Sequence, residues 1–243
     1  MFDRLKFATE LANELNKTNT QYLTSLMVEN AVASAVNGVV CALENKLADV
    51  VSVTNSTQYS VKSYKDAMIP KIMSSEEEER EDTGYIIERR ISGVTNPDGA
   101  ALDVFSDILK DLKNNENTNH ERNGTKKTKV VLLGHTQDDE YWYFRCTEAD
   151  YNFSVPDSAV AKNFSSRSKN YMLFTGNISS FIGYDETGKE IYKWIHPNSS
   201  TYTRCLMKKY SLSDKDSFFF KIKKSTYSRP SSEELMSMIF VSN

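Results

Sequence analysis

Apolar residues recur at helical spacing near the start of the chain. They stand three and four positions apart, at Phe2, Leu5, Ala8, Ala12 and Leu15. Such steps place side chains on one face of an α-helix, so the pattern predicts a helix that begins at Asp3. The polar stretch from Asn16 to Gln21 ends this helix.

A second and longer helix is predicted from about Thr20 to about Ser52. Its apolar seam alternates steps of four and three and is interrupted only by Glu29. The seam residues are Tyr22, Leu26, Ala33, Val36, Val40, Leu43, Leu47 and Val50. This heptad-like pattern corresponds to a rod of about 43 Å. Because such a helix packs either within its own domain or against another chain, we interpret the seam as a packing or oligomerisation surface.

Weaker patterns follow up to residue 113. Residues 53–63 indicate a loop or a weak edge strand, 65–73 a short helix, and 85–91 a strand. The acidic run from Glu76 to Asp82 is typical of a solvated face or a loop.

Asn96-Pro97 is a typical helix start. The apolar stripe of that helix consists of Leu102, Phe105, Ile108, Leu109 and Leu112.

The segment Asn114–Thr128 contains no apolar side chain. A segment of this composition has no apolar surface to bury, so we predict a polar linker. The chain is thereby divided into a helical region (1–113), the linker (114–128) and a β-rich region (129–243). Most alanines precede residue 129 and most aromatic residues follow it, which agrees with the preferences of helices and strands.

The region after Thr128 is predicted to be mainly antiparallel β structure. Strands 129–135 and 141–147 form one hairpin, and strands 178–184 and 189–195 form another. Strands 202–210 and 217–224 are predicted to pair with each other, with a further strand at 170–176 and a short helix at 156–163. Residues 231–240 fit either a helix with a capping box or a final strand. With the N-terminal helices, these elements predict an α+β fold.

Composition narrows the class of protein. The 243 residues carry a net charge of −3, and 39% are apolar, which is ordinary for a globular protein. No apolar run reaches 18 residues, so we expect no membrane span. The three cysteines form no CxxC pair, which favours a reducing compartment, either the cytoplasm or a virion if the protein is viral.

The common catalytic motifs are missing from the sequence. There is no phosphate-binding glycine loop, no GxSxG and no HExxH, and the three histidines are isolated. We therefore predict no metal or cofactor and do not favour an enzyme. An active site assembled in space around His135, Asp138, Asp139 and His196 stays an alternative, because a histidine beside carboxylates can act as a general base. Acidic residues also favour turns, and we prefer that interpretation here.

A basic tract interleaved with aromatic residues lies near the end of the chain. Its cations include Arg204, Lys208, Lys209, Lys221, Lys223, Lys224 and Arg229. They could contact nucleic acid, with aromatic rings stacking on bases, or an acidic partner such as the Glu76–Asp82 run of another copy. In the alternative that we prefer, Phe218, Phe220 and Ile222 face the core while Lys221 and Lys223 face water.

Two functions follow as hypotheses. The first is a non-enzymatic structural or interaction protein, a homo- or hetero-oligomeric subunit of a larger assembly such as a virus or phage particle. It rests on the long apolar helix and on the missing catalytic motifs. The second is a nucleic-acid-binding or nucleic-acid-processing protein that uses the tract 204–229.

Overall fold

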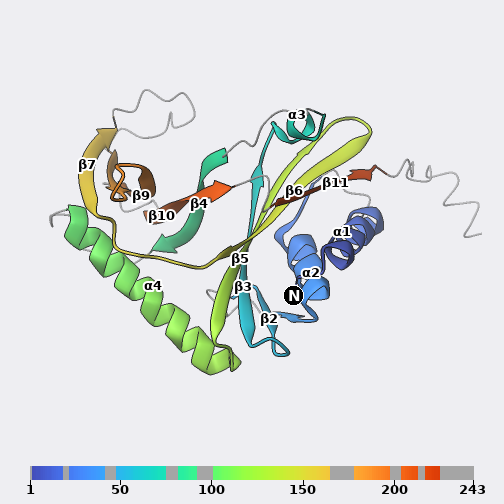
Figure 1. The fold of residues 1–243 in the computed structure, drawn as a ribbon, viewed down its shortest axis with the longest axis horizontal. Coiled ribbons are helices and arrows are strands. Elements are labelled where there is room, and N and C mark those ends of the chain that lie inside the picture. Colours follow the sequence, from blue (N-terminus) through green and yellow to red (C-terminus); the bar gives the residue numbers. More distant parts are fainter. Residues whose placement is uncertain are drawn as a thin grey trace, which may run out of the picture.

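The computed structural model describes residues 2–18, 22–41, 48–74, 82–91, 101–164, 178–197, 204–212 and 217–224. These residues form an α+β fold, as the sequence predicts. The strands make two sheets, and helices cover one face of each (Figure 1).

Sheet 1 contains six strands in the order β1-β2-β3-β5-β6-β11. Their bounds are β1 Val39–Val40, β2 Val50–Ser52, β3 Thr57–Lys65, β5 Lys127–Gln137, β6 Tyr141–Asp150 and β11 Ser217–Lys223. Every neighbouring pair is antiparallel except β3 and β5, which are parallel. The predicted hairpin over 129–147 is confirmed as β5–β6.

Sheet 2 contains five strands in the order β4-β10-β9-β8-β7, all antiparallel. Their bounds are β4 Asp82–Ile91, β10 Arg204–Leu212, β9 Glu190–Pro197, β8 Ile178–Tyr184 and β7 Ser158–Phe164. The predicted hairpin around Asp185–Gly188 is confirmed as β8–β9. Asp185 fixes its turn by accepting hydrogen bonds from the backbone nitrogens of Thr187 and Lys189, both at 2.9 Å.

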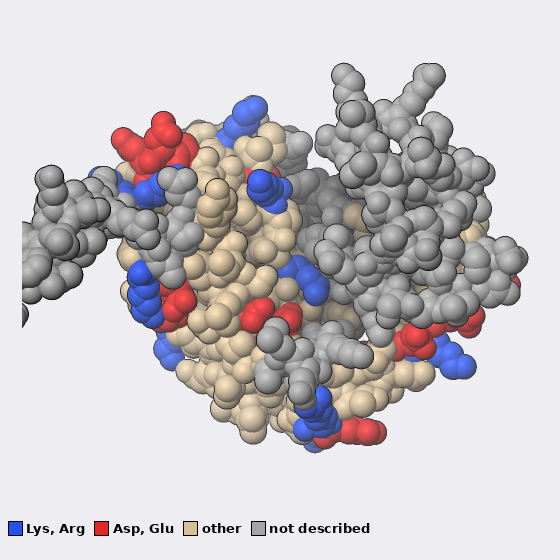
Figure 2. Space-filling model, turned by 180° about the vertical axis from the view of Figure 1, so that it is seen from behind, with Lys and Arg blue, Asp and Glu red and all other residues tan. Residues whose placement is uncertain are grey.

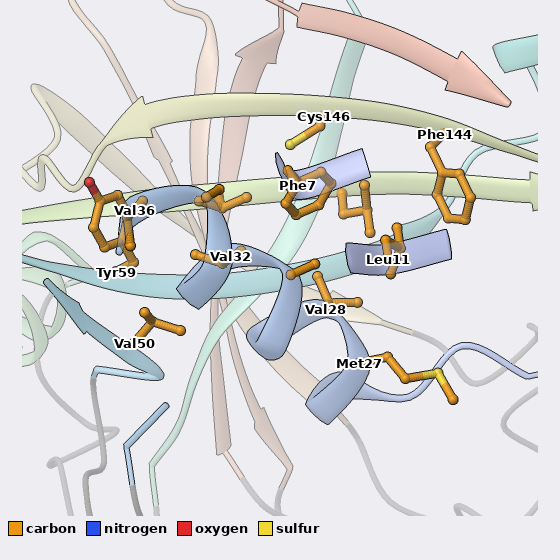
Figure 3. Close-up of a cluster of buried hydrophobic side chains, with 14 of the residues drawn as sticks. Phe7, Leu11, Met27, Val28, Val32, Val36, Val50, Tyr59, Phe144 and Cys146 are labelled. Carbon is orange, nitrogen blue, oxygen red and sulfur yellow. The ribbon is translucent and has the colours of Figure 1, made fainter. Parts of the chain in front are cut away.

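The first core lies between sheet 1 and the antiparallel helices α1 (Arg4–Thr18) and α2 (Ser25–Val36). Figure 3 shows Phe7 and Leu11 of α1 near Phe144 of β6, with the α2 side chains beside them. The buried face of α1 is Phe7, Leu11 and Leu15, whereas Leu5, which was predicted to belong to it, is 77% exposed. The helix is therefore rotated relative to the predicted stripe.

The predicted helix over residues 20–52 is wrong in its length. Helix α2 ends at Val36, because Asn37 adopts a left-handed conformation (φ 48°) and caps it. Gly38 then passes so close to β2 that a Cβ atom would lie 2.7 Å from the Val51 carbonyl oxygen. The chain then continues into β1 and, further on, β2.

The seam residues consequently lie in different environments. Val36 and Val50 are buried, and Ala33 and Val40 pack partly buried against the first core. Tyr22 is 76% exposed and Leu26 57% exposed. Leu43 and Leu47 lie outside the described residues. The structure thus does not present one continuous helical seam.

Helix α4 (Ala101–Asn123) joins the two sheets (Figure 1). Its first half packs on sheet 2, where the predicted stripe is confirmed except for Leu102, which is 37% exposed. Its second half occupies most of the predicted linker 114–128, so that prediction is wrong. Asn123 of α4 and Thr125 of the following turn donate hydrogen bonds to Gln58 of β3. These bonds hold this part of the chain against sheet 1 where it has no apolar side chains to bury.

Three further predictions are corrected. Residues 57–65 form the interior strand β3 instead of a loop or an edge strand, since β2 and β5 pair on its two sides. Residues 158–164 form β7, not a helix, because they pair with β8. Strands β10 and β11 do not pair with each other but belong to different sheets. The short helix is confirmed as α3 (Ile69–Ser74) and the strand at 85–91 as part of β4. The predictions for residues 170–176 and 231–240 concern segments outside the described residues.

A third cluster connects the two sheets. Val130 and Leu132 of β5 pack with Tyr151 and with Tyr210 of β10. This contact covers the middle of the face of sheet 1 that lies opposite α1 and α2.

Candidate interaction surface

The acidic residues after His135 build the β5–β6 turn. The Asp138 carboxylate accepts hydrogen bonds from the Glu140 nitrogen (2.8 Å), the Tyr141 nitrogen (2.7 Å) and the Tyr143 hydroxyl (2.7 Å). These bonds, the Tyr143 hydroxyl first, lower the pKa of Asp138. Asp139 and Glu140 are exposed. The arrangement agrees with the turn interpretation.

The two histidines of the alternative active site lie on different sheets. His135 is on β5, half-buried, with its ring centroid 6.2 Å from that of Trp142. Burial and the nearby Lys65 lower the pKa of His135. His196 is on β9 of sheet 2. Among the described residues, no group of three or more His, Cys, Asp or Glu side chains could hold a metal ion.

The basic tract is divided between the sheets. Arg204, Lys208 and Lys209 lie on β10, whereas Lys221 and Lys223 lie on β11 with Lys224 just beyond it. Arg229 lies outside the described residues. The Lys208 amine sits 4.5 Å from the centroid of the Phe153 ring and 5.0 Å from that of Tyr210, and it donates to the Asn152 carbonyl. Lys208 is therefore used within the contact between the sheets.

Strand β11 alternates as predicted. Phe218, Phe220 and Ile222 pack against the first core, beside α1, while Lys221 and Lys223 are exposed. The Phe7 ring of α1 meets the Phe218 and Phe220 rings edge-on, with centroids 6.0 Å apart in both pairs. Phe218, Phe219 and Phe220 all keep part of their surface in contact with solvent.

This strand is also an edge of its sheet. Among the described strands β11 pairs only with β6, with Lys221 opposite Tyr143 and Lys223 opposite Tyr141. The outward side of Phe218–Lys223 therefore meets no other described strand. We call this outward side of the strand the β11 edge.

Cations lie beside β11, but the contacts of Lys221 and Lys224 are with β6 and the β5–β6 turn and not on the outward side of the strand. The Lys221 amine is 4.7 Å from the centroid of the Tyr141 ring, and the Arg4 guanidinium is 5.3 Å from that of Phe218. Lys224 is held at the β5–β6 turn, where its backbone nitrogen donates to the Glu140 carbonyl at 2.8 Å. Strand β11 thus combines an outward side that meets no other described strand, partly exposed phenylalanines and nearby positive charge.

A polar network around His120 was not predicted from the sequence. His120 Nδ1 is 2.8 Å from Thr125 Oγ1, and its Nε2 is 3.5 Å from Glu116 Oε1. A histidine between a hydroxyl and a carboxylate can activate a nucleophile. Here, however, Thr125 is only 6% exposed and also donates to Gln58 Oε1 at 3.3 Å, so its hydroxyl is not open to a substrate. The network attaches α4 to sheet 1.

Charges of both signs are interspersed elsewhere on the surface. Figure 2 shows blue and red side chains scattered around a wide uncharged area, with no large patch of one sign on that face. The apolar side chains that are more than half exposed belong to the N-terminal part of the described chain: Leu5, Tyr22, Leu26, Val39 and Val53. Leu5 is on α1, Leu26 on α2 and Val39 on β1, whereas Tyr22 precedes α2 and Val53 follows β2.

Comparisons with known proteins identify no relative. No protein-family model, curated protein or solved structure matches this chain. In the described residues, no helix combines the length and apolar character needed to cross a membrane.

Proposed function

We propose that this chain is a non-enzymatic interaction protein, a subunit of a larger protein assembly, and that the β11 edge is one of its contact surfaces. The observation that carries the proposal is that β11 is an edge strand among the described strands of sheet 1, with phenylalanines that are only partly buried. Unpaired edge strands are templates for pairing with another chain. A partner strand on β11 would pair with its outward side and cover the rings.

The exposed apolar side chains of the N-terminal part give secondary support. Single exposed apolar residues are normal on any surface. Five that are more than half exposed, all within residues 5–53, are consistent with contacts to other chains on that side of the molecule.

Nucleic-acid binding is the alternative function. In its favour, Lys221 and Lys223 share a face of sheet 1 with Tyr141 and Tyr143, a combination that can hold phosphates and stack on bases. Against it, the acidic turn at Asp138–Glu140 adjoins these lysines and would repel phosphates. We therefore prefer the protein partner.

The proposal is tested with the full chain in its native cells. A photo-crosslinking residue is placed at Lys221 and, as a control, at the exposed Lys126, which lies between α4 and β5. A protein adduct from position 221 but not from position 126 is the expected result. The mass of the purified chain by light scattering then separates self-association from binding of a different protein. A monomer of 27.7 kDa without adducts at position 221 would refute the proposal.

A further inference from the structure

We propose that Asn123 is a site of spontaneous deamidation and that its product loosens the second half of α4 from sheet 1. The inference concerns a chemical modification of the chain and does not depend on the proposed function. The sequence contains two Asn-Gly pairs, Asn37-Gly38 and Asn123-Gly124. An asparagine before glycine reacts readily, because glycine has no side chain to hinder the approach of its nitrogen. The structure distinguishes the two pairs.

The reaction needs only the chain and water. The Gly124 nitrogen attacks the side-chain carbonyl carbon of Asn123, and a nitrogen–carbon bond forms as the bond from that carbon to Nδ2 breaks. The proton lost by the glycine nitrogen leaves with Nδ2 as ammonia, and a cyclic succinimide remains. Water then opens the ring at either carbonyl, which gives aspartate or isoaspartate.

Asn37 is held in a geometry that opposes this attack. Its backbone is left-handed, at φ 48° and ψ 49°, which puts its Cβ and the Gly38 nitrogen on opposite sides of the Cα–C bond. The Gly38 nitrogen also donates to the Ala33 carbonyl at 2.8 Å. Rotation is restricted because Gly38 lies against β2, where an added Cβ would be 2.7 Å from the Val51 carbonyl oxygen. We therefore expect Asn37 to react slowly in the folded chain.

Asn123 lies in a more permissive place. It is the last residue of α4, where the helix reaches the end of sheet 1 at which β3 and β5 begin (Figure 1). From a helical ψ, a smaller rotation about the same bond brings the glycine nitrogen to the side-chain carbon. Gly124 follows at φ 64°, and a Cβ added to it would meet no atom within 4 Å, so the chain has room to turn. Fraying of the last helical turn is therefore sufficient for attack.

The product cannot make the contact that Asn123 makes. Its Nδ2 donates to Gln58 Oε1 at 3.1 Å, and a carboxylate at that place would set one acceptor against another. In isoaspartate the main chain is also longer by one carbon before Thr125, whose nitrogen donates to the His120 carbonyl at 3.1 Å. Residues 114–123 have no apolar side chain to bury. Disturbing these polar contacts should therefore loosen this half of α4.

The first test compares the two pairs in the full chain. The chain is incubated in warm, mildly alkaline buffer, both folded and unfolded in urea, and deamidation at each asparagine is followed by mass spectrometry of peptides. In urea the two pairs should react at similar rates. In the folded chain Asn123 should react at least about ten-fold faster than Asn37. Equal rates in the folded chain, faster reaction at Asn37, or an unreactive Asn123 would overturn the inference.

The second test measures amide exchange in the deamidated chain. Exchange within residues 114–123 should be about five-fold faster than before deamidation, as expected for one lost hydrogen bond, and unchanged within 104–112. Asn123→Gln is the matched variant, because it keeps the amide while its longer side chain closes the ring much more slowly. The same incubation should leave its exchange unchanged. Asn117→Asp introduces the same charge at an exposed position of α4 and should not speed exchange.

Three exchange results would also overturn the inference. These are unchanged exchange in the deamidated wild type, the same acceleration in incubated Asn123→Gln, and the same acceleration in Asn117→Asp. The second result would assign the loosening to another change during incubation. The third would assign it to charge alone.

Discussion

Replacing Gln58 with leucine should detach the second half of α4 from sheet 1. Gln58 is fully buried on β3, and both ends of its amide are used. Its Nε2 donates to Thr128 Oγ1 at 3.0 Å, and its Oε1 accepts from Asn123 Nδ2 at 3.1 Å and from Thr125 Oγ1 at 3.3 Å.

These contacts form a closed ring with His120. Thr128 Oγ1 lies 3.3 Å from His120 Nε2, and His120 Nδ1 lies 2.8 Å from Thr125 Oγ1. One assignment of hydrogens satisfies every group: Gln58 donates to Thr128, Thr128 to Nε2, Nδ1 to Thr125, and Thr125 back to Gln58. Because Thr125 donates its hydroxyl proton to Gln58, this assignment places a proton on Nδ1 of His120.

The cost of Gln58→Leu follows from three lost hydrogen bonds. At about 1 kcal/mol each, the loss is about 3 kcal/mol, and the greater apolar burial of leucine reduces it to about 2 kcal/mol. The control is Asn115→Ala on the exposed side of α4, whose amide donates only to the Asp111 carbonyl one turn earlier. This control should change the free energy of unfolding by less than about 0.5 kcal/mol.

Urea unfolding of both variants, of Thr128→Val and of Gln58→Leu/Thr128→Val gives the measurement. In the double variant, Thr128 no longer presents an unsatisfied hydroxyl toward position 58, so its destabilisation should fall short of the sum of the single changes by about 1 kcal/mol. Additive single changes, or a loss below about 0.5 kcal/mol for Gln58→Leu, would refute the ring as the attachment of α4.

Three further predictions concern other parts of the chain. Because burial and Lys65 lower the pKa of His135, protonation opposes folding: the unfolding free energy should fall as the pH drops below the unfolded-state pKa of about 6.5. Urea midpoints of the wild type should therefore decline more steeply than those of His135→Gln between about pH 6.5 and 5.5, and parallel profiles would contradict this. Gly38→Ala should destabilise the fold by about 1–3 kcal/mol, because the Cβ atom of the alanine would press on the Val51 carbonyl oxygen. An unchanged melting temperature would argue against this close approach of Gly38 to β2. Limited proteolysis of the free chain should spare residues 114–123, since they are helical, and early cleavage there, mapped by mass spectrometry, would count against the extended α4.

Local sequence patterns were sufficient to predict the structure of a segment where residues close to it in sequence determine that structure. The β8–β9 hairpin was predictable because Asp185 and Gly188 build the turn from residues within it. The alternation of Phe218, Phe220 and Ile222 with Lys221 and Lys223 determined which face of β11 is buried, since side chains of a strand alternate whatever its partner is. The apolar stripe of α4 indicated its first half for the same reason.

The candidate surface was only half visible in the sequence. Lys221 and Lys223 were among the predicted contact residues, and their alternation with the phenylalanines is a local property. That β11 is an edge strand was not visible, because it depends on β6, some 70 residues earlier, taking the inner side and on no described strand taking the outer one. The same dependence places Arg204, Lys208 and Lys209 on the other sheet, although they lie close to Lys221 in sequence.

Long-range partners decided the rest, and they explain the errors. Val50 continues the spacing of a helix, yet it lies in β2 because β3 offers it a partner strand and Asn37–Gly38 ends α2 first. Residues 114–123 hold no apolar group, yet they are helical, and Gln58, 65 residues before Asn123, accepts a hydrogen bond from Asn123 at the end of this helix. The sequence by itself determined the periods of the elements and the faces that they bury. Only the tertiary structure decided which distant polar groups and strands meet, because a hydrogen-bond partner leaves no periodic trace in the segment that needs it.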